Sequence, residues 1–277
     1  MNLTSKKDIK HILEKYNIKP SKKFGQNFLV DEEILQKIAR TANIGPNDIV
    51  LEIGPGIGTL TEELAKKAKR VIAVEKDERM VEILRETLKK YKNIEIVKGD
   101  VLKIPITNKQ YLADEYKLVA NLPFYVAAPI IRKFLEEENP PKEMVLMVQK
   151  EVGQRICAKP PEMSLLAVSV QFYGRPEIAF YVGKGNFLPV PKVDSAVIKI
   201  VPSNNYLRIV GPDVFFKVAK AGFSQPRKQL ANNLSKGLKL DKEKASRWLL
   251  KNNIDFTRRA ESLKMEEWVE LAKNSSL

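Results

Sequence analysis

The fold is decided by residues 49–59, which read Ile49-Val50-Leu51-Glu52-Ile53-Gly54-Pro55-Gly56-Ile57-Gly58-Thr59. The first five residues are mostly branched and apolar, which predicts a short buried strand. Three glycines follow at alternate positions, and glycine lets a backbone approach a ligand closely. After them, Thr59 and Glu62 fit a capping box that would open a helix reaching Lys67. A strand, a glycine loop and a helix in this order predict the first unit of a parallel sheet that binds a nucleotide-like ligand.

Strand and helix patterns alternate on both sides of this unit. The expected strands lie at 71–74, 94–97, 117–120, 144–148, 177–182 and 195–201. The expected helices lie at 31–42, from 77 to about 91, near 127–135, at 151–158 and around 164–172, with Asp31 and Asp77 as caps. The last two strands follow each other closely, so we expect them to pair antiparallel at one sheet edge. The pattern predicts an α/β fold with a Rossmann-like parallel sheet and helices on both faces.

The pattern becomes wholly helical after Pro202-Ser203-Asn204-Asn205. We therefore expect two domains. The first is an α/β domain over residues 1–203, which starts with a basic extension at 1–22, and the second is a small all-helical domain over 204–277.

Composition narrows the chemistry. The chain carries 48 Lys and Arg against 34 Asp and Glu, a formal net charge of +14. Fifteen basic and eight acidic residues place +7 of this charge in 204–277, so a polyanion is an expected partner. The single Cys157 and the single His11 exclude a disulfide, a Cys/His zinc site or a Cys–His catalytic pair made from this chain alone, and we expect no metal. No apolar run approaches the ~18 residues of a membrane span, so we expect a cytoplasmic protein that does not enter a membrane. We also expect the protein to be a monomer.

The glycine spacing indicates what kind of nucleotide-like ligand binds. A dinucleotide fingerprint reads G-x-G-x-x-G, whereas the third glycine here, Gly58, comes one residue early, which suits a ligand without a pyrophosphate. Glu75 ends the second strand, where a carboxylate can accept hydrogen bonds from ribose hydroxyls. Asp100 follows the third strand and could read an adenine amine. These features favour an adenosine-containing cofactor, and the spacing together with the lack of an acid–base histidine disfavours an NAD-dependent dehydrogenase.

The turn Asn121-Leu122-Pro123-Phe124 follows the fourth strand, at the sheet edge where cofactor and substrate should meet. The side-chain carbonyl of Asn121 and the backbone carbonyl of Leu122 can accept the two N–H bonds of an exocyclic amine such as that of adenine. Pro123 fixes the turn, and Phe124 offers a stacking face for the base. Because such an amine becomes acidic as its methyl bond forms, alignment and desolvation can supply the rate without a strong base.

Several motifs in order resemble the ribosomal small-subunit RNA adenine dimethyltransferase family over almost the whole chain. The matching segments are Lys23-Phe24-Gly25-Gln26-Asn27-Phe28-Leu29, Glu52 to Gly58, Glu75-Lys76-Asp77, Gly99-Asp100, Asn121 to Phe124, Gln149-Lys150-Glu151-Val152, Phe187 to Ala196, and Arg259-Ala260-Glu261. Members of that family dimethylate two adjacent adenines near the end of the small-subunit RNA. The resemblance implies the same activity here, with docking on an immature, pre-ribosomal subunit through the helical domain.

The resemblance also implies roles for single residues. S-adenosyl-L-methionine would be the cofactor, held by Gln26, Asn27, Leu29, Gly54, Gly56, Glu75, Lys76, Asp100, Val101 and Asn121. Phe124 and Phe187 would sandwich the target base while Asn121 orients its amine. Most members have tyrosine where this chain has Phe124, so stacking is retained but a phenolic hydroxyl is lost.

A basic, amide-rich segment at 223–234 is a candidate RNA contact. We expect Pro226 to lie in the first turn of a helix whose Leu230 and Leu234 face the core. Arg227 and Lys228 would then be exposed to phosphates. The amide side chains of Gln229, Asn232 and Asn233 would lie on the more exposed faces, and Lys22 and Lys23 are further candidate RNA contacts.

Two alternatives stay open. One is the related large-subunit methyltransferase that confers macrolide resistance and tolerates phenylalanine in the Asn-Leu-Pro-Phe turn, although Pro191-Lys192-Val193-Asp194-Ser195-Ala196 favours the small-subunit family. The other is a non-enzymatic RNA-binding assembly or transcription factor on the same scaffold. The intact glycine loop, Glu75, Asp100 and Asn121 argue against that loss of activity.

Overall fold

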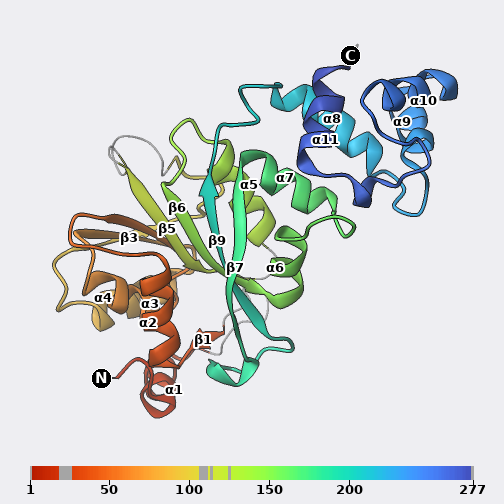
Figure 1. Cartoon of the computed structure of the whole chain (residues 1–277). Coiled ribbons are helices and arrows are strands. Elements are labelled where there is room, and N and C mark those ends of the chain that lie inside the picture. Colours follow the sequence, from red (N-terminus) through yellow and green to blue (C-terminus); the bar gives the residue numbers. More distant parts are fainter. Residues whose placement is uncertain (1, 19–26, 106–111, 113–114, 124–125, 276–277) are drawn as a thin grey trace. The chain divides into compact units, whose positions relative to one another are not determined.

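The computed structural model describes residues 2–18, 27–105, 112, 115–123 and 126–275 (Figure 1). The chain divides into two compact units. The first consists of Met1–Gly153 and Glu177–Val201, and the second of Gln154–Pro176 and Pro202–Leu277. Residues 154–176 therefore join the helical unit, whereas the sequence pattern placed them with the sheet.

A seven-stranded sheet organises the first unit (Figure 1). Its order is β4-β3-β2-β5-β6-β9-β7, with β2 (Ile49–Ile53), β3 (Arg70–Glu75), β4 (Ile94–Lys98), β5 (Tyr116–Asn121), β6 (Glu143–Gln149), β7 (Gly174–Val182) and β9 (Ser195–Pro202). The strands β4, β3, β2, β5 and β6 are parallel, and β9 is antiparallel to β6. β7 and β9 lie together at one edge, as expected. The chain runs outward from β2 on one side and from β5 on the other, so the strand order reverses between these two central strands.

Helices cover both faces of this sheet. They are α2 (Glu32–Thr41), α3 (Thr59–Ala65), α4 (Glu78–Thr87), α5 (Ala127–Glu136) and α6 (Lys150–Ile156). On one face, α2 and α3 contribute Leu35 and Leu64 to a core shared with Val50 of β2. Leu51 points to the opposite face and is also fully buried. The predicted Rossmann-like fold is confirmed in this unit.

Three helix ends, in two helices, differ from the prediction. Gly58, with φ +92°, is the N-cap residue of α3, so Thr59 is the first helical residue and the expected capping box is wrong. That helix ends at Ala65, and α4 ends at Thr87 rather than near Tyr91. The caps at Asp31 and Asp77 are confirmed, since each side chain accepts a hydrogen bond from a backbone N–H in the first turn.

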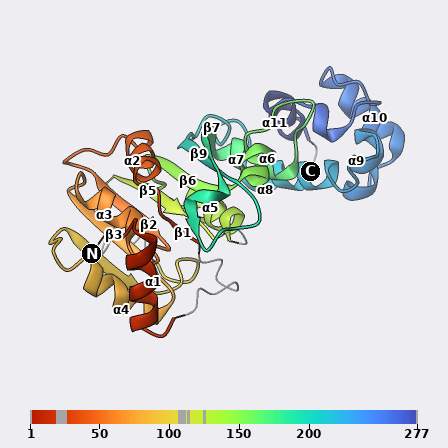
Figure 2. The same cartoon turned by 90° about the horizontal axis from the view of Figure 1, so that it is seen from below.

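The lysine-rich N-terminal extension contains a helix that the sequence analysis did not predict. In α1 (Lys6–Lys15), Ile9, Ile12 and Leu13 form a buried stripe. They join a core with Ile57 and with Met80 of α4, and Figure 2 shows α1 beside α4. The short strand β1 (Phe28–Leu29) then pairs antiparallel with β8 (Phe187–Leu188).

The second unit has a core of its own, built by helices. These are α7 (Leu165–Tyr173), α8 (Pro212–Gly222), α9 (Leu230–Leu238), α10 (Lys242–Lys251) and α11 (Met265–Lys273). Phe172 of α7 stacks on Phe215 of α8 with ring centroids 4.0 Å apart, which explains why 154–176 belongs with this unit. Trp268 of α11 is fully buried and stacks on Phe223.

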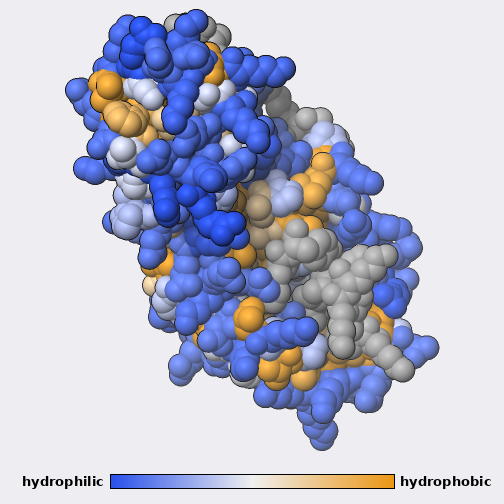
Figure 3. Space-filling model, turned by 90° about the vertical axis from the view of Figure 1, so that its right-hand side faces the viewer, coloured by the Kyte–Doolittle hydropathy of each residue, from blue (hydrophilic) through white to orange (hydrophobic). Residues whose placement is uncertain are grey.

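The surface is mostly polar. The face drawn in Figure 3 is predominantly hydrophilic, with hydrophobic residues in small separate patches. In the described part of the chain, none of the helices has the length and apolar character that a membrane crossing requires.

Candidate active site

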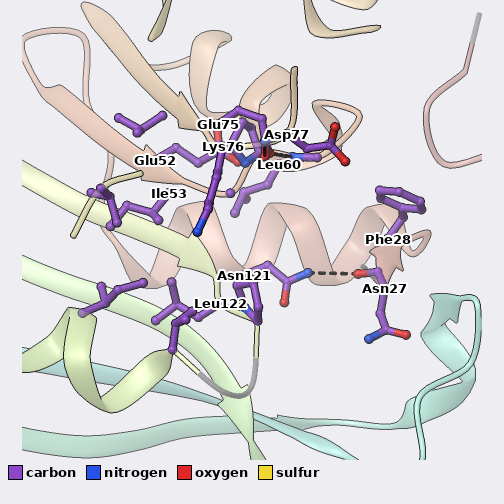
Figure 4. Close-up of a pocket in the computed structure, with 18 of the residues that line it drawn as sticks. Asn27, Phe28, Glu52, Ile53, Leu60, Glu75, Lys76, Asp77, Asn121 and Leu122 are labelled. Atoms are coloured by element: carbon purple, nitrogen blue, oxygen red, sulfur yellow. Dashed lines mark hydrogen bonds between the residues drawn. The ribbon is translucent and has the colours of Figure 1, made fainter. Parts of the chain in front are cut away.

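A cavity of about 340 Å³ opens at the carboxyl ends of β2, β3 and β5, where the strand order reverses (Figure 4). The predicted site residues that line it are Asn27, Leu29, Gly54, Gly56, Glu75, Lys76, Asp100, Val101, Asn121, Leu122, Pro123 and Phe187. Gln26, Phe124, Lys22 and Lys23 lie outside the described residues. The fold thus gathers segments that are far apart in the sequence around one cavity.

The glycine loop lines the cavity through Gly54 and Gly56, in a conformation that favours glycine. Gly54, Gly56 and Gly58 have φ values of +67°, +60° and +92°. A Cβ added to Gly56 would lie 3.1 Å from Cε1 of Phe28. The φ value of Gly56 and the nearby Phe28 ring therefore both disfavour a side chain at this position. Without a side chain, the backbone of Gly56 can contact a ligand in the cavity directly.

Glu75 lies at the end of β3 and is held by the backbone. Its Oε2 accepts a hydrogen bond of 3.2 Å from the N–H of Gly56, and its Oε1 accepts one of 2.8 Å from the N–H of Asp77. Burial raises the pKa of this carboxyl, and the backbone N–H groups oppose the shift. Each oxygen keeps a lone pair, so Glu75 can accept further hydrogen bonds from a ligand in the cavity.

Asp100 follows β4 and is paired with Lys76. The Nζ of Lys76 lies 2.9 Å from Oδ2, and the N–H of Leu102 donates to Oδ1 over 3.1 Å. The hydrogen bond from Lys76 holds the pKa of Asp100 below its usual value. Asp100 is therefore an ionised acceptor, and the carboxylate retains lone pairs toward the cavity.

Asn121 ends β5 and is oriented by the N-terminal segment. Its Nδ2 donates a hydrogen bond of 3.3 Å to the backbone carbonyl of Asn27, as Figure 4 shows. Because the nitrogen is engaged there, the side-chain oxygen is the end that can act on a ligand. The N–H of the following residue, Leu122, donates to the carbonyl of Met147 on β6, which fixes the turn to the sheet.

Phe187 lines the cavity from β8, which lies far along the chain from the glycine loop. In the β1–β8 pair, Phe187 lies opposite Leu29, and both side chains line the cavity. Phe187 is buried, with 2% of its surface exposed. The two-stranded pair therefore joins two predicted site residues that the sequence pattern could not connect.

Glu52 is a site residue to which the sequence analysis gave no role. It lines the cavity from β2 and is only 1% exposed. Burial, together with the negative charge of Glu75, raises the pKa of Glu52 to about 8. Its Oε2 has no hydrogen-bond partner among the described residues. The signal in the sequence is a lone acidic residue inside an otherwise apolar strand.

Comparison with known proteins shows which family this site belongs to. The family described as "Ribosomal RNA adenine dimethylase" matches this chain over residues 17–275. This chain belongs to that family. It is 45% identical over 265 residues to the ribosomal RNA small subunit methyltransferase A of Dehalococcoides mccartyi (strain CBDB1), covering 95% of this chain and 90% of the relative. The protein of the same name from Alkaliphilus oremlandii (strain OhILAs) is 42% identical over 279 residues, covering 98% of this chain and 97% of that relative.

Solved structures confirm the fold. A dimethyladenosine transferase from Plasmodium falciparum gives a TM-score of 0.74 at 26% identity, covering 87% of this chain and 94% of that one. The 23S rRNA methyltransferase ErmE gives a TM-score of 0.70, also at 26% identity, covering 89% and 98%. The two structures are equally similar in sequence, so the fold alone does not separate the two rRNA alternatives. The relatives named as small-subunit methyltransferases, at 42–45% identity, favour the small subunit.

The dimethylase family uses S-adenosyl-L-methionine, and the cavity of this chain fits that cofactor. Carboxylates at Glu75 and Asp100 match the hydroxyl and amine donors of an adenosine. The unpartnered Oε2 of buried Glu52 suits a hydrogen bond with a polar group of the cofactor. Because Gly56 has no side chain, the part of S-adenosyl-L-methionine between its adenosine and methionine ends can lie close to the backbone there. Within the described residues, no group of three or more His, Cys, Asp or Glu could hold a metal ion.

Proposed function

We propose that this chain dimethylates the N6 amines of two adjacent adenines in small-subunit ribosomal RNA. The observation that carries the proposal is the fixed orientation of Asn121, whose Nδ2 donates to the carbonyl of Asn27 in the lining of the cofactor cavity. An enzyme for this reaction needs an acceptor that turns a weakly nucleophilic amine toward the cofactor. The small-subunit relatives support the choice of RNA.

The chemistry follows from the residues that surround the cavity. S-adenosyl-L-methionine, when bound, supplies an electrophilic methyl group on a sulfonium. The side-chain oxygen of Asn121 accepts an N–H of the adenine amine, which favours a pyramidal nitrogen whose lone pair is no longer delocalised into the ring and faces the cavity. Phe187 offers a ring face for the base, and we place Phe124 on its other side by resemblance. The amine proton becomes acidic as the new bond forms, so it can leave to water without a strong base.

The helical unit supplies a surface for docking on RNA. Arg227 and Lys228 are exposed in the turn between α8 and α9. That turn is anchored by buried Asn233, whose Nδ2 donates to the carbonyls of Gly222 and Gln225 over 2.7 Å and 2.9 Å. A rigid turn can present both cations to phosphates at low cost in conformational entropy.

Two details of this segment differ from the prediction. Helix α9 starts at Leu230, so Pro226 lies in the preceding turn and not in the first turn of the helix. Asn233 is only 2% exposed, because it anchors the turn instead of facing solvent. Leu230 and Leu234 are fully buried, as predicted.

We further propose that the enzyme acts as a monomer in the cytoplasm, on a pre-ribosomal particle. The experiment that tests the substrate supplies labelled S-adenosyl-L-methionine with immature small subunits, mature small subunits or large subunits. We expect methyl incorporation into immature small subunits. Incorporation only into large subunits would favour the macrolide-resistance alternative, and none into any particle would favour a non-enzymatic assembly factor.

A further inference from the structure

An exposed aromatic and basic cluster lies at the end of β7, outside the cavity. Tyr181 is 51% exposed, although it lies in a strand, and the Nζ of Lys150 lies 5.3 Å from the centroid of its ring. Lys184 follows in the short 3-10 helix η1 (Lys184–Asn186) and is also exposed. We call Lys150, Tyr181 and Lys184 the β7 cluster.

One residue holds the backbone of both lysines in place. The backbone carbonyl of Asp194 accepts a hydrogen bond of 3.0 Å from the N–H of Lys150. Its side-chain Oδ1 accepts another of 3.0 Å from the N–H of Lys184. Asp194 therefore connects the start of α6 to the start of η1. The backbone positions from which the two lysine side chains extend are fixed relative to each other.

The β7 cluster lies close along the chain to Phe187, the residue of the cavity lining that we expect to contact the target base. Lys184 precedes Phe187 by three residues, and three residues span at most about 11 Å. Phe187 lines the cavity and is fixed by the β1–β8 pair, while the carbonyl of Asn186 accepts a hydrogen bond of 2.9 Å from Val30. A strand whose base enters the cavity beside Phe187 would therefore continue within reach of Lys184.

The charges and the ring indicate what chemistry the cluster binds. Among the residues that the structure describes, neither Lys150 nor Lys184 forms an ion pair with a carboxylate. Two exposed ammonium groups without such an ion pair, beside an exposed aromatic face, match a single-stranded nucleic acid, in which phosphates alternate with bases that can stack. An enzyme that draws one base into a pocket also leaves its neighbours unstacked, so a second stacking surface would offset that cost.

We propose that the β7 cluster binds the RNA strand that flanks the target adenine, with a neighbouring base on Tyr181 and phosphates on Lys150 and Lys184. The proposal rests on the proposed function, because it assumes that a base of an RNA strand occupies the cavity.

Four variants test this assignment. Tyr181→Ala removes the ring and Tyr181→Phe keeps it, while Lys150→Ala/Lys184→Ala removes both charges. The matched control is Lys69→Ala/Lys92→Ala, which removes two exposed lysines just before β3 and β4, at the edge of the sheet opposite the cavity. Each variant is assayed for KM and kcat on immature small subunits, and for binding of labelled small-subunit RNA over a salt series.

We expect Tyr181→Ala to raise KM by about 5-fold or more, with kcat within about two-fold and Tyr181→Phe close to wild type. The lysine pair should reduce the log–log salt slope of RNA binding by about 1.4, which is about 0.7 for each phosphate of a single strand, while the control pair leaves it unchanged. If Tyr181→Ala and the lysine pair both behave like the control pair in RNA binding, the proposal is wrong. A wild-type enzyme that methylates no RNA would overturn the proposed function instead, and the binding series would still decide the role of the cluster.

Discussion

The side chain of Asn121 is held by the backbone of Asn27: Nδ2 donates over 3.3 Å to the carbonyl oxygen, so the side-chain oxygen is directed by a segment distant in sequence. Asn121→Ala should lower kcat about 100-fold, because the amine loses its acceptor in the transition state. Affinity for S-adenosyl-L-methionine should change by less than about three-fold. Equal losses in kcat and in cofactor affinity would mean that Asn121 only shapes the cofactor cavity.

Asn121→Asp tests whether the hydrogen bond to Asn27 orients the acceptor oxygen. The aspartate keeps an acceptor oxygen but lacks the N–H that bonds to Asn27, so the oxygen is no longer held in one orientation. We expect kcat between those of wild type and Asn121→Ala in single-turnover assays. An aspartate variant as fast as wild type would show that the hydrogen bond to Asn27 does not orient the acceptor.

Glu75→Ala should weaken cofactor binding. A charge-assisted hydrogen bond contributes roughly 1.5 to 3 kcal/mol, which corresponds to a loss of about 10- to 150-fold in affinity. Calorimetry with S-adenosyl-L-methionine measures the loss, and Glu78→Ala, three residues away at an exposed carboxylate paired with Lys98, is the control. A dissociation constant unchanged in Glu75→Ala would remove this residue from the site.

Gly56→Ala should destabilise the protein and weaken cofactor binding together. The backbone at φ +60° disfavours any side chain by about 1 to 2 kcal/mol, and the new Cβ would press on Phe28. Gly185→Ala is a matched control, because a Cβ there would have no neighbour within 4 Å. Thermal unfolding with and without cofactor compares the two, and equal stability of both variants would contradict the strain at Gly56.

Glu52 should make the stability of the protein fall with rising pH. Its pKa is about 8 in the folded chain against an ordinary value of 4.5, so the folded state keeps a proton that the unfolded state loses. The stabilisation is complete below pH 4.5 and is lost as the pH rises through 8, on the order of 5 kcal/mol in total. Denaturant unfolding of Glu52→Gln should therefore show a weaker decline than wild type between about pH 5 and 8.5. Parallel declines would show that Glu52 ionises normally.

The double change Arg227→Ala/Lys228→Ala should weaken RNA binding and reduce its salt dependence. Each phosphate contact contributes about 0.7 to 0.9 to the log–log slope, so the slope should fall by up to about 2. Lys69→Ala/Lys92→Ala removes the same charge elsewhere, and cofactor affinity should not change in either variant. Superimposable salt titrations of wild type and the Arg227/Lys228 variant would mean that these residues only add surface charge.

Local patterns were enough to predict the sheet and much of the site. Strands such as 49–53 are continuous apolar runs, and Glu75, Asp100 and Asn121 directly follow or end such runs, so their place at the carboxyl edge follows from a parallel sheet. The helix at 6–15 was missed because its buried stripe is short and lies among lysines.

Contacts between distant segments could not be predicted in this way. The pairing of Leu29 with Phe187 and the hydrogen bond between Asn27 and Asn121 depend on how the N-terminal segment folds back over the sheet. The raised pKa of Glu52 depends on its burial in the folded chain and on the charge of Glu75, which are also tertiary features. Phe172 likewise packs in the helical unit through ring contacts with Phe215, Phe216 and Tyr206, which follow it far along the chain.

The most direct test of the central claim maps the product of the reaction. Immature small subunits are methylated to completion with S-adenosyl-L-methionine, and the RNA fragments are sequenced by mass spectrometry. We predict N6,N6-dimethyladenine at two adjacent positions of the small-subunit RNA, and far less of it when Asn121→Ala is incubated for the same time. Methyl groups on another base, on a ring nitrogen or on large-subunit RNA alone would contradict the account.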